Sequence, residues 1–195
     1  MANGQLETKV RTGEVRLSYP HLFEAHAMDG GEAKYSVSLI IPKNDKDTLL
    51  KIKKAIEAAV EQGVSSKWNG KKPANLKMPL RDGDTERPED EAYAGAYFIN
   101  TTCKTKPGVV LSTRVGTKFV EATPEDVYAG CYGIASVNFY PFNAKGNKGV
   151  ACGLNNIMKT KDGENLGGRI DADTDFADVD IPEGEEALDM NDLLG

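Results

Sequence analysis

Five separate stretches of this sequence alternate apolar and polar residues with a period of two, and this pattern most constrains the fold. A strand with this pattern buries one face and exposes the other. The five stretches are residues 10–19, 34–41, 96–103, 132–140 and 149–158, and residues 109–111 form a shorter candidate. The clearest stretch is 96–103, and the face that we expect to be buried carries Tyr97, Ile99, Thr101 and Cys103. The chain is therefore predicted to be mainly β.

A single stretch has strong helical periodicity. The residues that recur at the spacing of one helix face are Leu49, Ile52, Ile56, Ala59 and Val60. Asn44 or Asp45 is a good N-cap before this stretch, and Gly63 is expected to end the helix as a C′ residue. Residues 63–95 then lack clear periodicity and are predicted to form a long loop. Loops of that length inside a compact domain are uncommon and usually functional.

Charge is distributed unevenly along the chain. Residues 171–195 contain ten Asp or Glu and no Lys or Arg, whereas residues 1–170 carry 24 basic and 20 acidic residues. A strongly acidic tail joined to a weakly basic body is typical of a body that binds a polyanion and a tail that interacts with a partner. Apolar residues are interleaved with acids in residues 188–195, which a purely solubilising tail would not need. A disordered, solvating end is the alternative.

Aromatic residues recur beside lysine or arginine on the predicted strands and loops. Trp68 lies among lysines in the long loop, although a tryptophan that anchored the loop to the core would look the same. Proteins bind single-stranded nucleic acid by stacking bases on aromatic rings and by holding phosphates with cations. The expected stacking residues are Trp68, Phe98, Tyr132 and Tyr140, and the expected phosphate-binding residues are Lys67, Lys71, Lys72, Lys77, Arg81, Lys104, Lys106, Arg114, Lys145 and Lys148.

The sequence carries no pattern that indicates an enzyme. His21 and His26 are the two histidines, so general acid–base chemistry has few carriers, and no cysteine lies near them to suggest a metal site. The acids of residues 82–86 resemble the start of a calcium loop, but Arg87 stands where that loop requires glycine. A metal-dependent nuclease built on Asp82, Asp84 and Glu86 is the weakest alternative. We therefore expect no catalytic residue, metal or cofactor.

The remaining features suggest one cytosolic domain. The three cysteines are widely spaced and form no Cys-x-x-Cys pair, which favours reduced, buried thiols. The chain has no run of 18 apolar residues, and residues 1–10 are too polar for a signal peptide. Five or six strands with one helix and a long loop favour a five-stranded antiparallel Greek-key barrel of the OB type, with a sandwich or another α+β sheet as alternatives. We expect this domain at residues 1–166 and a flexible hinge with a disordered acidic tail at residues 167–195.

The sequence also resembles a known family, the OB-fold single-stranded-DNA-binding proteins of tailed bacteriophages and prophages. The resemblance covers nearly the whole body in order and is carried by residues 15–24 (VRLSYPHLFE), 34–43 (KYSVSLIIPK), 80–84 (LRDGD), 93–100 (YAGAYFIN), 106–110 (KPGVV), 127–133 (VYAGCYG), 138–140 (NFY) and 149–157 (GVACGLNNI). It implies an OB fold, binding of single-stranded DNA without sequence preference, and a role in phage DNA replication or recombination in the host cytoplasm. Tails of such proteins end in acids around an apolar tip, and residues 188–195 look similar, with Leu193-Leu194-Gly195 in place of the usual terminal Phe.

Together these observations predict a non-enzymatic protein that coats and protects single-stranded DNA. The tail is expected to compete with DNA and, once displaced, to recruit replication or recombination proteins through Asp189, Met190, Asp192, Leu193 and Leu194. No membrane contact is expected, and a homodimer is left open. The alternative is a protein-interaction or assembly module whose acidic tail mimics DNA.

Overall fold

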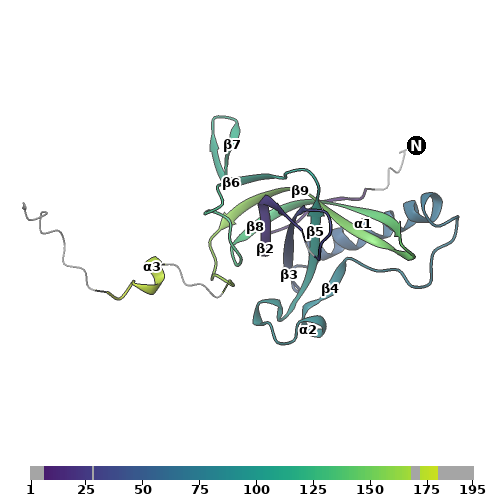
Figure 1. Cartoon of the computed structure of the whole chain (residues 1–195), viewed down its shortest axis with the longest axis horizontal. Helices are drawn as coiled ribbons and strands as arrows, with labels where there is room; N and C mark the ends of the chain where they lie inside the picture. The colour runs from purple at the N-terminus through teal and green to yellow at the C-terminus, as the bar shows by residue number, and fades with distance from the viewer. Residues whose placement is uncertain (1–6, 28, 168–171, 180–195) are drawn as a thin grey trace, which may run out of the picture.

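The computed structural model describes residues 7–27, 29–167 and 172–179 (Figure 1). Its strands are β1 (Lys9–Arg11), β2 (Val15–His26), β3 (Lys34–Pro42), β4 (Leu80–Asp82), β5 (Ala96–Cys103), β6 (Gly108–Val115), β7 (Lys118–Glu121), β8 (Tyr132–Ala144) and β9 (Asn147–Lys161). Its helices are α1 (Lys46–Ser66), α2 (Gly83–Glu86), the single 3-10 turn η1 (Glu91–Tyr93) and α3 (Ala172–Asp175).

Five of these strands close a barrel in the order β8-β2-β3-β5-β9, and β9 pairs back to β8. The pairings are antiparallel except between β5 and β9, which run parallel where Thr102 faces Gly153. Strand β1 adds to β8, and β6 continues beside β9 and turns back as β7. The prediction of a mainly β chain with an OB-type barrel and one main helix is confirmed.

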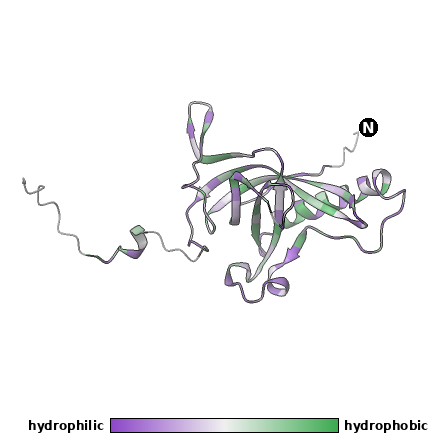
Figure 2. Cartoon of the chain, viewed as in Figure 1, coloured by the Kyte–Doolittle hydropathy of each residue, from purple (hydrophilic) through white to green (hydrophobic). Residues whose placement is uncertain are grey.

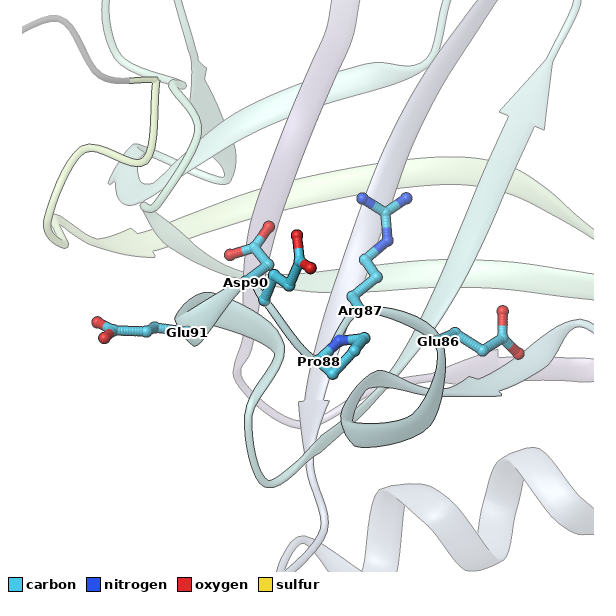
Figure 3. Close-up of a pocket in the computed structure, with 6 residues that line it drawn as sticks. Glu86, Arg87, Pro88, Asp90 and Glu91 are labelled. Carbon is cyan, nitrogen blue, oxygen red and sulfur yellow. The ribbon is translucent and has the colours of Figure 1, made fainter.

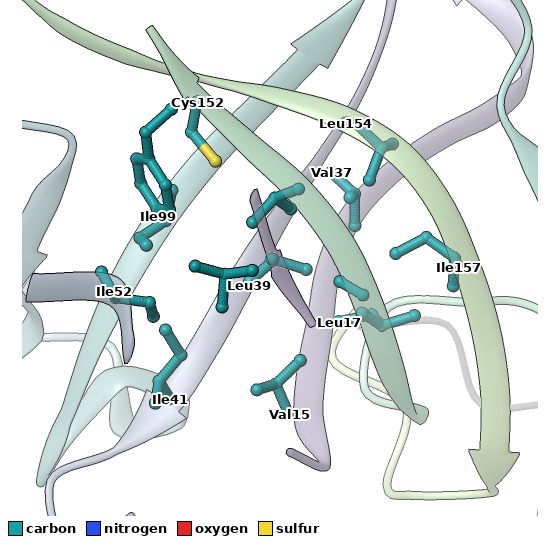
Figure 4. Close-up of a cluster of buried hydrophobic side chains, with 14 of the residues drawn as sticks. Val15, Leu17, Val37, Leu39, Ile41, Ile52, Ile99, Cys152, Leu154 and Ile157 are labelled. Atoms are coloured by element: carbon teal, nitrogen blue, oxygen red, sulfur yellow. The ribbon is translucent and has the colours of Figure 1, made fainter. Parts of the chain in front are cut away.

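The alternating residues meet inside this barrel, as the period-two pattern predicts. Figure 4 shows side chains of β2, β3, β5 and β9 converging on one cluster with Ile52 of α1. The barrel residues of the cluster with no exposed surface include Val15, Leu17, Leu39, Ile41, Ile99, Val137, Phe139 and Ile157. Full burial of such a side chain contributes about 1.5–3 kcal/mol. Figure 2 shows hydrophobic residues gathered on the barrel strands and α1, whereas the segment after α1 is mainly hydrophilic.

Helix α1 begins as predicted but ends later than predicted. The Asp45 side chain caps it by accepting a hydrogen bond from the Thr48 amide at 3.2 Å, and the helix packs against β8. The chain stays helical through Gly63 to Ser66, so the expected end at Gly63 is wrong. A Cβ atom at Gly63 would lie 2.5 Å from Cζ3 of Trp68. The glycine therefore gives the Trp68 indole room to lie on the helix and does not terminate it.

Two further local expectations differ from the structure. The strand predicted to end at residue 19 passes as β2 through Pro20 to His26, because a bulge after Ser18 shifts its register. The segment predicted to be a long loop contains β4, α2 and η1. The expected hinge and tail lie largely outside the described residues.

The cysteine side chains agree with the prediction of reduced thiols. Cys131 and Cys152 are buried and Cys103 is half-buried, and all three are free thiols. Within the described ranges, no helix has the length and apolar character needed to span a membrane. Among the residues that the structure describes, no group of three or more His, Cys, Asp or Glu side chains could hold a metal ion.

Candidate nucleic-acid interface

Small polar residues form a continuous row on the outer face of the barrel. Ser38 lies opposite Asn100 and Ser36 opposite Thr102 across β3 and β5. Thr102 faces Gly153 of β9, which in turn pairs with Asn138 of β8. We call this row the polar strip, and its members are Ser36, Ser38, Asn100, Thr102, Gly153 and Asn138. Ser38 is buried beside the Tyr93 hydroxyl, whereas Asn100 is exposed and the other four members are partly exposed. Strands 2 and 3 of an OB barrel are the face that binds oligonucleotides.

Tyr140 stands beside the polar strip on β8. Its side chain is 40% exposed, and a Cβ atom at Gly153 would lie 3.5 Å from its Cε1 atom. The ring therefore extends over β9 next to the strip with part of its surface open. Partial burial raises the pKa of the Tyr140 hydroxyl, so the side chain is neutral at physiological pH. The expectation that Tyr140 is available for stacking fits this placement.

Tyr19 is a second exposed aromatic that sequence patterning missed. Tyr19 is in phase with Val15 and Leu17 in the period-two stretch 10–19, but the bulge in β2 turns it outward, where it is 57% exposed. Its φ angle of 48° lies in the left-handed region, which is rare for a residue with a bulky side chain. The Arg87 guanidinium lies 5.7 Å from its ring centroid. Strain of this kind is concentrated at functional sites.

Arg87 joins Tyr19 to a second, smaller hydrophobic cluster on the outer face of the barrel. Its guanidinium also lies 4.7 Å from the ring centroid of Tyr93 and 5.1 Å from that of Phe98. Figure 3 shows Arg87 reaching toward the barrel strands, whereas Glu86 and Glu91 of the same surface hollow point away. A cation held over three rings is a fixed positive charge beside the polar strip.

Phe98 is not available for stacking in this structure. It lies on the outer face of β5 as predicted, but residues 83–95 fold over it and leave it with no exposed surface. Tyr93 contacts the Phe98 ring edge-to-face, with centroids 5.1 Å apart. The sequence interpretation of Phe98 is therefore corrected: the ring is the centre of the second cluster, whose other buried members are Ile40 and Ala96.

Trp68 also occupies a structural position. Its side chain is 3% exposed, belongs to the main core cluster, and donates a hydrogen bond from Nε1 to the Phe142 carbonyl at 3.2 Å. A base cannot stack on a ring that is covered in this way. The anchor alternative describes Trp68 correctly, and the stacking expectation does not. Tyr132 is half-buried, with Lys161 4.6 Å and Arg16 5.7 Å from its ring centroid.

Six of the ten predicted phosphate-binding residues come together at one end of the molecule. The loop after α1 runs beside the β8–β9 hairpin, where the Lys77 amide donates to the Lys148 carbonyl at 2.9 Å and the Val150 amide donates to the Lys77 carbonyl at 2.9 Å. We call this cluster the lysine end, and its members are Lys67, Lys71, Lys72, Lys77, Lys145 and Lys148. Among the described residues, no salt bridge involves any of the six.

The other four predicted cations are arranged differently. Arg81 forms a salt bridge with Glu86, and Lys104 pairs with Glu32 at 3.1 Å. Lys106 lies in the turn before β6, and Arg114 lies on the β6–β7 hairpin, 4.3 Å from the ring centroid of Phe119. The structure therefore does not join these four to the lysine end.

The acids of residues 82–86 are held by a protein cation. Lys43 Nζ lies 2.8 Å from Asp82 and 2.6 Å from Asp84, and this contact holds the pKa of Asp84 below its usual value. The ammonium group takes the place that a metal would need between these two carboxylates. The predicted tail contacts, Asp189 to Leu194, lie outside the described residues.

Comparison with known proteins gives consistent matches. Residues 8–188 match the family described as the ssDNA-binding protein of Enterobacter phage Enc34. Protein p50 of Acyrthosiphon pisum secondary endosymbiont phage 1 is 30% identical over 191 residues, covering 92% of this chain and 98% of p50. The structure of the single-stranded DNA-binding protein from bacteriophage Enc34 in complex with ssDNA is 30% identical, with a TM-score of 0.69 over 82% of this chain and 90% of that chain. The single-stranded DNA binding protein encoded by bacteriophage T7 is 18% identical, with a TM-score of 0.58 over 92% and 98% of the two chains, a likeness of fold alone.

Proposed function

The chain belongs to the family of the ssDNA-binding protein of Enterobacter phage Enc34, and from this premise we propose that it binds single-stranded DNA without sequence preference across the polar strip. The observation that carries the proposal is the placement of the strip between two exposed tyrosines and next to the lysine end. Bases would stack on Tyr140 and Tyr19, and the lysines would hold phosphates. The small hydroxyl and amide groups of the polar strip can accommodate any base, which suits binding without sequence preference.

Affinity is expected to fall steeply with salt. Each lysine that neutralises a phosphate of a single strand contributes about −0.7 to the slope of log K against log salt, so six lysines give roughly −4 and a loss of about 300-fold between 50 and 200 mM. Titration of fluorescently labelled oligo-dT at several salt concentrations measures this slope. Replacing Lys71 and Lys72 with glutamine should flatten the slope by roughly 1.4.

A matched control is available on α1. Lys51 and Lys54 are exposed on the helix, and replacing both with glutamine makes the same change in charge away from the polar strip. This control should leave the slope unchanged. If the two double variants gave the same slope as the wild type, the lysine end would not contact phosphates. If neither the wild type nor any variant bound oligo-dT, the assembly-module alternative would replace this proposal.

We further propose that residues 1–166 form the DNA-binding domain and that residues 167–195 compete with DNA for its basic surface. Residues 171–195 carry ten acids and no cation, whereas residues 1–170 carry 24 basic and 20 acidic residues, so the tail makes the chain net negative. Displacement of the tail by DNA would free residues 189–194 to recruit replication or recombination proteins. The site of action would be the cytoplasm of a bacterial host.

Deletion of residues 171–195 is expected to tighten binding of oligo-dT. The deletion removes ten acids and no cations, so the gain should be several-fold at low salt and should vanish when salt screens the tail. Titration of the full chain and the deletion variant in parallel measures the difference. Equal or weaker binding by the deletion variant at low salt would rule out competition by the tail.

A further inference from the structure

An apolar recess lies between the β6–β7 hairpin and the start of β8. It has a volume of about 310 Å³, and its apolar walls include Val110, Phe119, Ile134 and Met158. Figure 1 shows the hairpin at the end of the β8–β9 ribbon opposite the hairpin tip that carries the lysine end. The DNA interface proposed above uses none of these residues.

The recess is continuous with the polar strip along the outer face of the β8–β9 ribbon. From the strip pair Asn138–Gly153, the next pairs toward the recess are Ser136–Asn156 and then Ile134–Met158. Ser136 and Asn156 lie on the outer face of the β8–β9 ribbon and also line the recess. A chain segment that filled the recess would therefore place its neighbouring residues next to the strip.

The charges around the recess favour an acidic occupant. Arg11 is the charged residue among those that line it, and it is exposed at the position paired with Ser136. Arg114 lies 4.3 Å from the ring centroid of Phe119, on the hairpin side. Glu121 of β7 is an exposed acid on the same hairpin, opposite Val110. An occupant that combines apolar side chains with acids would pack against the apolar walls and pair its carboxylates with the two guanidinium groups.

Residues 188–195 have this combination of apolar and acidic side chains. They read Leu-Asp-Met-Asn-Asp-Leu-Leu-Gly, and a tail that only carried charge would not need the apolar members. The connection from residue 167 to residue 188 can extend to roughly 70 Å. The chain leaves the barrel at Lys161, close after Met158, so the recess is within easy reach. Because these residues belong to the same chain, their effective concentration near the recess is high, which lets a weak contact form.

We propose that residues 188–195 dock in this recess of their own chain, with Leu193 and Leu194 against its apolar walls and Asp189 and Asp192 toward Arg11 and the polar strip. Docking would hold the acids where DNA would otherwise bind, a consequence that rests on the proposed function. The docking itself can be tested without DNA.

The test uses the full chain with carbon-13 labels on the methionine methyl groups. Met158 lines the recess, so its methyl resonance reports on the occupant. Replacing Leu193 and Leu194 with aspartate should shift the Met158 resonance. The matched control replaces Val179 and Ile181 with aspartate, the same chemical change elsewhere in the tail, and should leave that resonance in place. An unshifted Met158 resonance in the Leu193→Asp/Leu194→Asp variant would overturn the proposal.

A photo-crosslinking amino acid at position 194 identifies the partner of the tail directly. Cross-links should map to residues 108–121 or 156–158 of the same chain. In an isotopically mixed sample, links between two chains would assign the recess to a second copy and overturn docking within one chain. A Met158 resonance that ignored the tail but shifted on addition of oligo-dT would assign the recess to DNA. Loss of oligo-dT binding with Met158 still sensitive to the tail would overturn the proposed function alone.

Discussion

Replacing Trp68 with alanine should lower the free energy of unfolding by about 3–5 kcal/mol, the usual loss for a buried tryptophan. The indole is 3% exposed, packs on Gly63 and donates a hydrogen bond to the Phe142 carbonyl. Its removal leaves a cavity and an unpaired carbonyl between α1 and the β8–β9 hairpin. Because Trp68 is the sole tryptophan, unfolding in urea should be followed by circular dichroism.

Two variants bracket this result. Trp68→Phe retains most of the apolar volume and should cost clearly less than Trp68→Ala. Leu50 is 52% exposed on α1, and Leu50→Ala should change stability by less than about 0.5 kcal/mol. If Trp68→Ala left stability unchanged but weakened binding of oligo-dT, the ring would have to leave the core and stack on a base. We expect the opposite pattern, with Trp68→Phe folded and binding oligo-dT almost as the wild type does.

The barrel could be predicted from sequence because its strands bury one face each. For β5 the predicted and observed bounds agree at residues 96–103, since turns isolate this strand on both sides. The end of α1 could not be predicted, because a glycine that follows a helical stretch commonly ends the helix. Only the contact with Trp68 explains why Gly63 lies inside the helix here. The same contact decides between the two interpretations of Trp68, which the local sequence left open.

The candidate interface was less predictable than the barrel. Phe98 lies on the predicted outer face, but it is covered by a segment that carries no periodic signal of its own. Tyr19 follows the period-two pattern in the sequence and departs from it in space, because a bulge changes the phase of β2. The lysine end depends on backbone contacts between Lys77 and the β8–β9 hairpin, which residue patterns do not reveal. The exposure of Tyr140 was predictable because its strand is regular and its neighbours on that face are polar, and its role in stacking stays a prediction.

Removing both exposed tyrosines should weaken DNA binding more than any other change to the interface. Loss of one stacked base is worth about 1–3 kcal/mol, so Tyr19→Ala and Tyr140→Ala should each reduce affinity for oligo-dT by roughly 5- to 150-fold. The double variant should lose about the product of the two. The salt slope should stay at its wild-type value, because no phosphate contact is removed. Tyr132→Ala is the matched control, since cations lie near that ring and it begins β8, beyond Ser136 and Ile134 from the strip member Asn138.

Tyr19 offers a sharper form of the same experiment. Because its φ angle is 48°, Tyr19→Gly should relieve backbone strain and raise the free energy of unfolding by about 1 kcal/mol. A variant that is more stable and yet binds DNA more weakly cannot owe its weak binding to misfolding. Urea unfolding and oligo-dT titration of this one variant therefore separate the two roles. If it bound as tightly as the wild type, the Tyr19 ring would not stack on a base, and Tyr140 alone would remain as the proposed stacking residue.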